Sequence, residues 1–330
     1  MTVAWVLGSG GMLGAALCRQ LRGAGTHLFA PAERFSWSAG EALSAQIEAA
    51  VQAFAERAST ADRWEIYWAA GVGTMGSSVA DLAPETRALS LLLQFLAGEP
   101  RLMAASGTVA LASTAGAIYA GATDEVITED TVPAPTTDYA RAKLSQEALL
   151  RGFAEGHARV AVLMARISTL YGGGQAAGKK QGLMSHLARS ILRNQAVQIY
   201  VPYDTIRDYI TADDAAAAMV AASRRGGGDA RVLVKIVASE RPATIAEIVS
   251  IFRRLARRAP RIATRASPLA GLYARRVQFR SIVLISRPRV PPTTLAVGIA
   301  QLMAAERLAL MRGAAWMQAE LQHRQIPRLK

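Results

Sequence analysis

The N-terminal residues place a short apolar run directly before a cluster of glycines. Residues 3–7 read Val-Ala-Trp-Val-Leu, and glycines follow at positions 8, 10, 11 and 14. Leucines then recur every four residues from position 13 to position 21, which is the spacing of one face of a helix. This order predicts a buried strand, a tight turn and a helix, so the chain is expected to begin with an α/β unit.

Apolar strand-like segments and helix-like segments alternate through the first half of the chain. Predicted strands cover residues 3–7, 26–30, 64–70, 107–113 and 159–165, and predicted helices cover residues 12–22, 41–58, 82–96 and 138–155. Elements of these lengths in alternation predict a doubly wound parallel sheet, the Rossmann type of α/β fold. We therefore expect a Rossmann domain at residues 1–166.

The pattern loosens after residue 166. Short predicted strands at residues 197–201 and 231–237 mix with predicted helices at residues 213–223, 244–258 and 294–310. We expect residues 167–330 to form mainly a smaller, mixed α/β C-terminal lobe, with some segments returning to the first domain. At 330 residues the chain is long enough for one large domain and one smaller one.

The positive charge of the chain is concentrated in one segment. The net charge is +13, and residues 248–305 contain eleven arginines and no acidic residue. Such a segment can attract nucleic acid, an anionic membrane surface or an anionic substrate, or it can be a solvated surface. Only three aromatic residues lie among these arginines, whereas proteins that bind nucleic acid usually add aromatic stacking platforms. We favour the solvated surface and expect no nucleic-acid partner.

Cysteine, histidine and hydropathy patterns exclude several further classes. Cys18 is the only cysteine, so no internal disulfide is possible, and the four histidines lack the spacing of metal ligands. No apolar run reaches the roughly 18 residues that a membrane span needs. We predict a cytoplasmic protein that has no integral membrane segment and binds no metal.

The glycine cluster also has a chemical interpretation. Gly8, Gly11 and Gly14 lack Cβ atoms, so their backbone can approach a pyrophosphate while the N–H groups and dipole of the following helix face its charge. The cofactor is therefore predicted to be a dinucleotide. Residues 28–32 contain no acid for a ribose 2′-hydroxyl, and Arg34 follows shortly after, which favours NADP over NAD. The alternative is that Arg34 is merely exposed.

A tyrosine and a lysine lie one helical turn apart in the predicted helix at residues 138–155. Tyr139 and Lys143 project from the same face, and the ammonium is expected to lower the pKa of the phenol. Tyr139 can then exchange a proton with a carbonyl or alcohol oxygen while hydride moves at the carbon. Ser113 and Thr114 add two hydroxyls at the carboxyl end of a predicted strand, where open α/β sheets bind ligands.

Taken together, these segments resemble the extended short-chain dehydrogenases/reductases of the nucleotide-sugar epimerase, dehydratase and reductase type. The matching stretches are residues 8–14, 68–71, 113–119, 127–130, 139–143, 166–172 and 206–210. The resemblance implies that Thr114, Tyr139 and Lys143 are catalytic and that Lys143 also holds the nicotinamide ribose. It further implies the cofactor-binding set Gly8, Gly11, Met12, Leu13, Gly14, Ala69, Ala70 and Gly71, and the substrate-binding residues Thr169 and Arg207. A planar guanidinium at Arg207 suits a diphosphate, although an ion pair with Asp208 or Asp213 is the alternative.

Departures from the family pattern narrow the reaction. Ala115 and Gly116 stand where dehydratases carry an acidic pair, so dehydration lacks its acid and base. Cys18 belongs to the first predicted helix and cannot serve a 3,5-epimerase-reductase. Thr169 replaces the usual asparagine, and Ile167 replaces the usual proline, which leaves the substrate contacts there open.

Three functions stay open, and they differ in what the cofactor does. The first is reduction of a 4-keto nucleotide-linked sugar, with hydride from the nicotinamide of NADP(H) and a proton from Tyr139. The second is a nucleotide-sugar 4-epimerase that holds NAD tightly and recycles it. The third is a non-catalytic NADP-binding sensor or scaffold. The resemblance also implies a homodimer.

Overall fold

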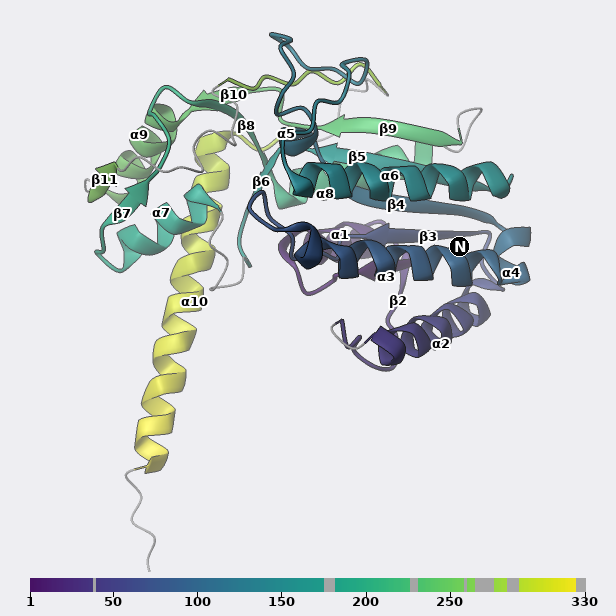
Figure 1. The fold of residues 1–330 in the computed structure, drawn as a ribbon. Coiled ribbons are helices and arrows are strands. Elements are labelled where there is room, and N and C mark those ends of the chain that lie inside the picture. Colours follow the sequence, from purple (N-terminus) through teal and green to yellow (C-terminus); the bar gives the residue numbers. More distant parts are fainter. Residues whose placement is uncertain are drawn as a thin grey trace, which may run out of the picture.

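A six-stranded parallel sheet forms the centre of the fold. The computed structural model describes residues 1–37, 40–174, 182–225, 231–257, 260–264, 276–283 and 291–324, with side chains as far as residue 312. Its strands are β1 (Thr2–Leu7), β2 (His27–Phe29), β3 (Arg63–Trp68), β4 (Ser106–Thr114), β5 (Val160–Ile167) and β9 (Val232–Val237). They lie in the order β2-β1-β3-β4-β5-β9 (Figure 1). The predicted Rossmann-type sheet is confirmed.

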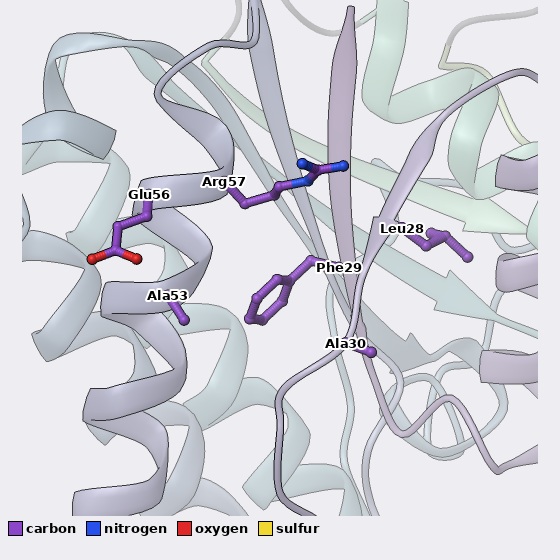
Figure 2. A pocket seen from close by; sticks show the side chains of 6 residues that line it. All are labelled: Leu28, Phe29, Ala30, Ala53, Glu56 and Arg57. Atoms are coloured by element: carbon purple, nitrogen blue, oxygen red, sulfur yellow. The ribbon is translucent and has the colours of Figure 1, made fainter.

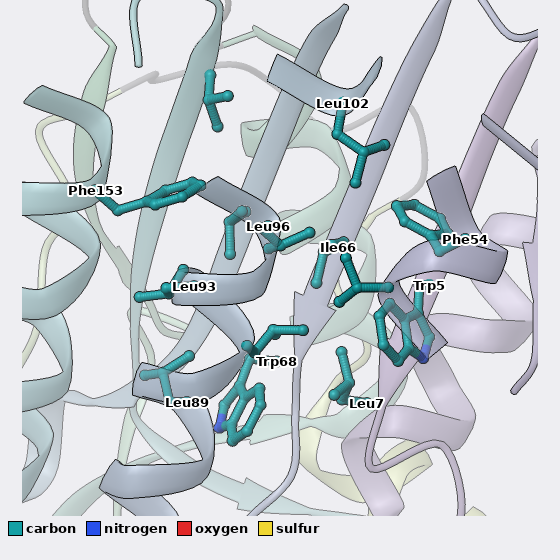
Figure 3. Packing of buried hydrophobic residues seen from close by; sticks show 14 of the residues in the cluster. Trp5, Leu7, Phe54, Ile66, Trp68, Leu89, Leu93, Leu96, Leu102 and Phe153 are labelled. Atoms are coloured by element: carbon teal, nitrogen blue, oxygen red, sulfur yellow. The ribbon is translucent and has the colours of Figure 1, made fainter. Parts of the chain in front are cut away.

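Helices cover both faces of this sheet. One face carries α2 (Gly40–Ala58), α3 (Val79–Ala97), the short α4 (Pro100–Ala104) and α6 (Asp138–Gly156), and the other carries α1 (Met12–Gly23) and α8 (Ala212–Arg225). Figure 3 shows the packing on the first face, where Trp5 and Ile66 from the strands meet Phe54 of α2 and Leu93 of α3. Strands that are apolar on both sides are buried by these two layers, which is the environment of a parallel sheet.

The C-terminal lobe has a separate core and two small sheets. One sheet joins β10 (Pro242–Thr244), β8 (Ile206–Thr211) and β6 (Thr169–Tyr171), and the other joins β11 (Ile262–Thr264) and β7 (Val197–Ile199). The helices are α7 (Leu183–Leu192), α9 (Ile245–Ala256) and α10 (Leu295–Arg324). Apolar side chains from these helices, such as Leu187, Phe252 and Leu302, form the core of the lobe. Beyond the core α10 extends away from the lobe (Figure 1).

Two segments of the second half pack with the first domain. β9 pairs in parallel with β5, and α8 packs against α1 on the sheet. The mixed lobe is thus present, while the boundary between residues 166 and 167 stays a prediction. None of the helices in the described part of the chain is long and apolar enough to cross a membrane.

The strand order changes direction at β1, and this locates a crevice. β1 lies between β2 and β3. After β1 the chain goes on to β2, and after β3 it goes on to β4, so these two connections run in opposite directions across the sheet. In open α/β sheets, ligands bind outside the carboxyl ends of the strands at such a switch point. The glycine cluster follows β1, and residues 69–71 follow β3, so both segments lie at this crevice.

Candidate active site

The loop after β1 packs directly on the loop after β3. Gly8 has a φ of +84°, and its carbonyl accepts a hydrogen bond of 2.9 Å from the N–H of Gly11. A Cβ on Gly8 would lie 2.6 Å from backbone atoms of Ala69 and Ala70. Only glycine therefore fits at position 8, because both the backbone conformation and the contact exclude a side chain. The structure brings together these predicted cofactor residues.

The N-terminus of α1 is open to an anion. The helix begins at Met12. Its cap residue is Gly11, so no side chain caps the first N–H groups, and the first turn holds no acidic residue. A Cβ on Gly10 would meet nothing within 4 Å. A cleft of about 420 Å³ is lined on one side by the first residues of α1, with Gly10 and Gly11, and on the other by residues of the second half of the chain, among them Gly173, Asp213 and Leu302. Backbone N–H groups at a helix N-terminus bind phosphate well. The residues of this loop therefore fit the diphosphate of a dinucleotide.

The first turns of α6 position the predicted catalytic pair, Tyr139 and Lys143. The side chain of Thr137 accepts a hydrogen bond from the N–H of Ala140, which caps the helix and fixes where it begins. Tyr139 then lies in the first turn and Lys143 in the next. The ammonium nitrogen of Lys143 is 5.8 Å from the centre of the Tyr139 ring, so the predicted pairing is present in the structure.

Lys143 is buried and makes an ion pair that the sequence does not signal. Its Nζ donates to Oε1 of Glu85 on α3 at 2.6 Å and to Oε1 of Gln146 at 3.0 Å. The side chains of Lys143 and Glu85 are only 7% and 9% exposed. Glu85 is not among the predicted site residues. It is 58 positions from Lys143 in the sequence and on another helix, so no local pattern indicates their contact.

Glu85 also reaches the predicted cofactor loop. A Cβ on Gly71 would lie 2.7 Å from both carboxylate oxygens of Glu85, and a Cβ on Gly73 would lie 3.3 Å from the ring of Tyr139. The loop after β3 therefore contacts the glycine loop through Ala69, Glu85 through Gly71 and the ring of Tyr139 through Gly73. This loop joins the two halves of the predicted site.

The electrostatics of the pair differ from the expectation in one respect. Burial raises the pKa of the Tyr139 phenol, Lys143 lowers it, Glu85 raises it again, and the net direction is upward. Burial lowers the pKa of Lys143, but the charges of Tyr139 and Glu85 outweigh it, so this pKa is also raised. The expected fall in the pKa of Tyr139 is wrong for this arrangement, because burial and Glu85 outweigh the attraction of the ammonium.

A second buried hydrogen-bond network connects α6, which carries Tyr139 and Lys143, with the strands β4 and β5. Arg166 donates to both carboxylate oxygens of Glu147 at 3.0 and 2.7 Å, and Ser113 donates to the same carboxylate at 2.6 Å. Arg166 also donates to the hydroxyl of Tyr119 at 2.5 Å. The hydroxyl of Ser113 is therefore committed to this network.

Thr114 ends β4 and is half-buried. Its hydroxyl oxygen accepts from the N–H of Ala117 at 3.4 Å and caps the short α5 (Ala115–Ile118). This contact leaves the hydroxyl proton free to be donated elsewhere. Its catalytic role stays a prediction.

The remaining predicted residues lie farther out. Arg34 is exposed in the loop after β2. Thr169 on β6 pairs with Tyr209 on β8, and Arg207 lies two residues before Tyr209, half-buried in the same small sheet. The register therefore brings the two substrate-binding predictions into one sheet next to the large one.

A second hollow lies away from the pair. It has a volume of about 510 Å³ and is lined by Leu28, Phe29 and Ala30 of the β2 region and by Ala53, Glu56 and Arg57 of α2 (Figure 2). Because β2 is the edge strand of the sheet, this groove lies at its outer edge. Tyr139 and Lys143 do not line it.

Comparisons with known proteins agree with this geometry. The model of the NAD dependent epimerase/dehydratase family matches residues 4–234. UDP-glucose 4-epimerase of Thermus thermophilus in complex with NAD has 20% identity and a TM-score of 0.74, with 93% of this chain and 99% of that chain covered. A comparison with curated protein sequences gives no match.

Two further solved structures have the same fold. RMD from Pseudomonas aeruginosa complexed with NADPH has 20% identity and a TM-score of 0.72, covering 93% of this chain and 99% of that chain. UDP-glucuronic acid 4-epimerase from Bacillus cereus, in complex with UDP-glucuronic acid and NAD, has 17% identity and a TM-score of 0.70, covering 94% and 100%. The family match spans most of the chain, so the predicted resemblance is confirmed: this chain belongs to the NAD-dependent epimerase/dehydratase family and is an NAD(P)-dependent enzyme of the extended short-chain dehydrogenase/reductase type.

Proposed function

We propose that the protein reduces a 4-keto nucleotide-linked sugar, with NADPH as the hydride source and Tyr139 as the proton donor. The observation that carries the proposal is the position of Tyr139 beside Gly73, on the loop that also contacts the glycine cradle. The Tyr139 phenol is protonated at neutral pH, since the ordinary pKa of a tyrosine is about 10 and burial raises it further. A protonated phenol donates to a ketone oxygen, which is what reduction needs.

The chain supplies the proton and the orientation of the reacting oxygen. When bound, the dihydronicotinamide supplies a hydride, that is, both electrons, to the ketone carbon. Tyr139 donates its phenolic proton to the ketone oxygen, so that the C=O bond becomes C–OH and a phenolate is left. Lys143 stabilises that phenolate by its charge, and Thr114 donates a hydrogen bond that holds the oxygen in place. Water then returns a proton to Tyr139.

Anion-binding residues support the choice of ligands. The open N-terminus of α1 binds the cofactor diphosphate at Gly8, Gly11 and Gly14, with Met12 and Leu13 in the first turn. Arg34 binds the 2′-phosphate of NADP, and Arg207 with Thr169 binds the diphosphate side of the substrate. The protein is proposed to act as a cytoplasmic homodimer.

The 4-epimerase is the second candidate. It is favoured by the solved structures named above, since two of them are described as 4-epimerases in complex with NAD. An epimerase must remove a proton from a hydroxyl and later return one, so Tyr139 would serve both reactions. The absence of an acid in residues 28–32, with Arg34 shortly after, favours NADPH and places reduction first.

The experiment measures cofactor content and turnover. Nucleotide released from the purified protein is identified by mass spectrometry, and NADPH absorbance is then followed with a UDP-linked 4-keto sugar. We expect reversible NADPH uptake and substrate-dependent oxidation. Tyr139→Phe should lower kcat by about 100- to 10,000-fold, because it removes the proton donor. Tyr200→Phe is the control, since this hydroxyl is exposed and reaches Gln198.

Three outcomes decide against the proposal. Tightly retained NAD, with interconversion of sugars and no net loss of NADPH, makes the protein an epimerase. Full turnover in Tyr139→Phe removes Tyr139 from the mechanism. NADP binding without turnover of any nucleotide-linked sugar supports the sensor instead.

A further inference from the structure

The carboxylate of Glu85 is in contact with the ammonium of Lys143, whose positive charge the proposed chemistry uses. Glu85 contacts the ammonium of Lys143 at 2.6 Å, and both side chains are buried. Gln146 strengthens the contact, because its amide oxygen accepts from Lys143 and its amide nitrogen donates to Glu85 at 3.2 Å. The same amide nitrogen donates to Thr86 at 3.2 Å, so Gln146 is itself held in place and keeps Glu85 and Lys143 in one geometry.

The other charged groups packed around the pair are balanced among themselves. Glu147 lies one residue beyond Gln146 on α6, but Arg166 of β5 and Ser113 of β4 fully engage its carboxylate. Tyr119 of the α5 region accepts from Arg166. Of the described groups around Lys143, Glu85 is thus the anion in contact with its ammonium.

We propose that Glu85 is a positioning residue, which neutralises the ammonium of Lys143 and so keeps Tyr139 in the protonated form that donates to a ketone oxygen. The inference rests on the proposed reductase activity and states why this site works in that direction. An isolated Lys143 would favour the phenolate of Tyr139, the form that removes a proton from an alcohol. The ion pair with Glu85 opposes formation of this phenolate, because the carboxylate already balances the charge of Lys143.

The proton balance follows from this arrangement. In reduction, Tyr139 loses its phenolic proton to the substrate oxygen while hydride arrives at carbon, and water protonates the phenolate afterwards. In oxidation, the phenolate must form first, and its proton has to leave for water before the alcohol can be deprotonated. Glu85 raises the cost of the phenolate, which oxidation needs before its first step and which reduction forms only as the proton is transferred. The resting site therefore holds the proton that reduction uses.

The first test is a titration that needs no substrate. The phenolate absorbance of Tyr139 is obtained as the difference between the protein and its Tyr139→Phe counterpart over the alkaline range. In Glu85→Gln we expect ionisation of Tyr139 at a pH about one to two units lower than in the wild type, because Lys143 is then unmatched. Glu99→Gln is the matched control. It removes a carboxylate that pairs with Arg101, a partner outside the site, and should leave the titration unchanged.

A double variant shows whether the effect passes through Lys143. In Glu85→Gln/Lys143→Met both charges are absent, so Tyr139 should ionise at higher pH than in Glu85→Gln. If Glu85→Gln fails to fold, as judged by far-ultraviolet circular dichroism, Lys143→Met is compared with the double variant. The proposal then predicts ionisation at lower pH in the double variant, since the carboxylate next to the phenol is gone.

Kinetics provide the second readout. The rate of reduction in Glu85→Gln should fall off at lower pH than in the wild type, and oxidation of the alcohol at neutral pH should rise about tenfold for each unit that the titration moves. Rescue by Glu85→Asp is expected to be partial, because the shorter side chain cannot hold the 2.6 Å contact without movement.

The outcomes separate this inference from the proposed function. A shifted titration in a protein that reduces no 4-keto sugar leaves the role of Glu85 standing and removes the reductase. Reduction that depends on Tyr139, with an unchanged titration in Glu85→Gln and in the comparison of Lys143→Met with the double variant, keeps the reductase and overturns the role of Glu85.

Discussion

Gly14 lies in the first turn of α1, and its Cα faces the carbonyl of Gly8. A Cβ at this position would lie 2.1 Å from the Gly8 oxygen and 2.6 Å from the Gly8 carbonyl carbon. Both atoms belong to the backbone of the turn that presents N–H groups to the predicted diphosphate. Substitution by alanine therefore tests whether the close approach in this loop is a condition for cofactor binding.

Two opposing effects set the magnitude of Gly14→Ala. Alanine inside a helix is favoured over glycine by about 1 kcal/mol. Against this, the loop has to move by about 1 Å to regain ordinary contact, and overpacking of this kind costs about 1–3 kcal/mol. We expect a net loss of about 0–2 kcal/mol in the free energy of unfolding. The shifted turn also weakens hydrogen bonds to the charged diphosphate, each of which contributes about 1.5–3 kcal/mol, so NADPH should bind about 10- to 100-fold more weakly.

Gly23→Ala is the matched control at the other end of the same helix. A Cβ on Gly23 meets nothing within 4 Å and lies far along α1 from the glycine loop, so neither stability nor NADPH affinity should fall. Urea unfolding and calorimetric titration with NADPH measure both quantities for the two variants. If Gly14→Ala stabilises the protein as helix propensity alone predicts, and NADPH affinity is unchanged, the reasoning about the glycine loop is refuted.

Two further predictions concern Arg34 and the buried tyrosines. Arg34→Ala should raise the KM for NADPH by about tenfold or more and leave that for NADH unchanged, since a charge-assisted contact to the 2′-phosphate is lost; equal effects on both cofactors would remove this contact. Burial raises the pKa of Tyr171 and of Tyr209 to about 12. Because these values lie above the unfolded value of about 10, the stability that each contributes, about 3 kcal/mol, is present below about pH 10 and is lost as the pH rises to about 12. Urea unfolding across this range should show the loss, and Tyr209→Phe should reduce it; an unchanged slope would contradict the burial argument.

The large sheet could be predicted because its signals are local. Each long strand is a continuous apolar run, and each helix between strands carries its own periodicity, so β1, β3, β4, β5 and β9 were identified without tertiary information. The predicted strand at residues 64–70 ends earlier, at Trp68, which frees Ala69 and Ala70 to contact Gly8.

The lobe was predicted less completely for a physical reason. The strands β6 and β10 have three residues each, which is too short for a period to be recognised, and they exist because they pair with β8. The helix α7 was also not predicted. Of the predicted arginine-rich segment, residues 258–259, 265–275 and 284–290 lie outside the described residues.

The site shows the same division between local and long-range information. The pairing of Tyr139 with Lys143 follows from helical spacing, and the position of the glycine loop follows from the strand before it. The ion pair with Glu85 depends on how α3 packs against α6 and has no signal in either helix. The direction of the pKa of Tyr139 therefore could not be obtained from residues 139–143 alone.

The most direct measurement follows the transferred hydride and its dependence on Tyr139. The protein is incubated with NADPH that carries deuterium on the transferable position and with a UDP-linked 4-keto sugar, and the product is analysed by mass spectrometry and nuclear magnetic resonance. The account predicts one deuterium at C4 of the sugar for each NADPH consumed, and in Tyr139→Phe the label should appear about 100- to 10,000-fold more slowly. Product without deuterium, or equal transfer in Tyr139→Phe, would contradict it.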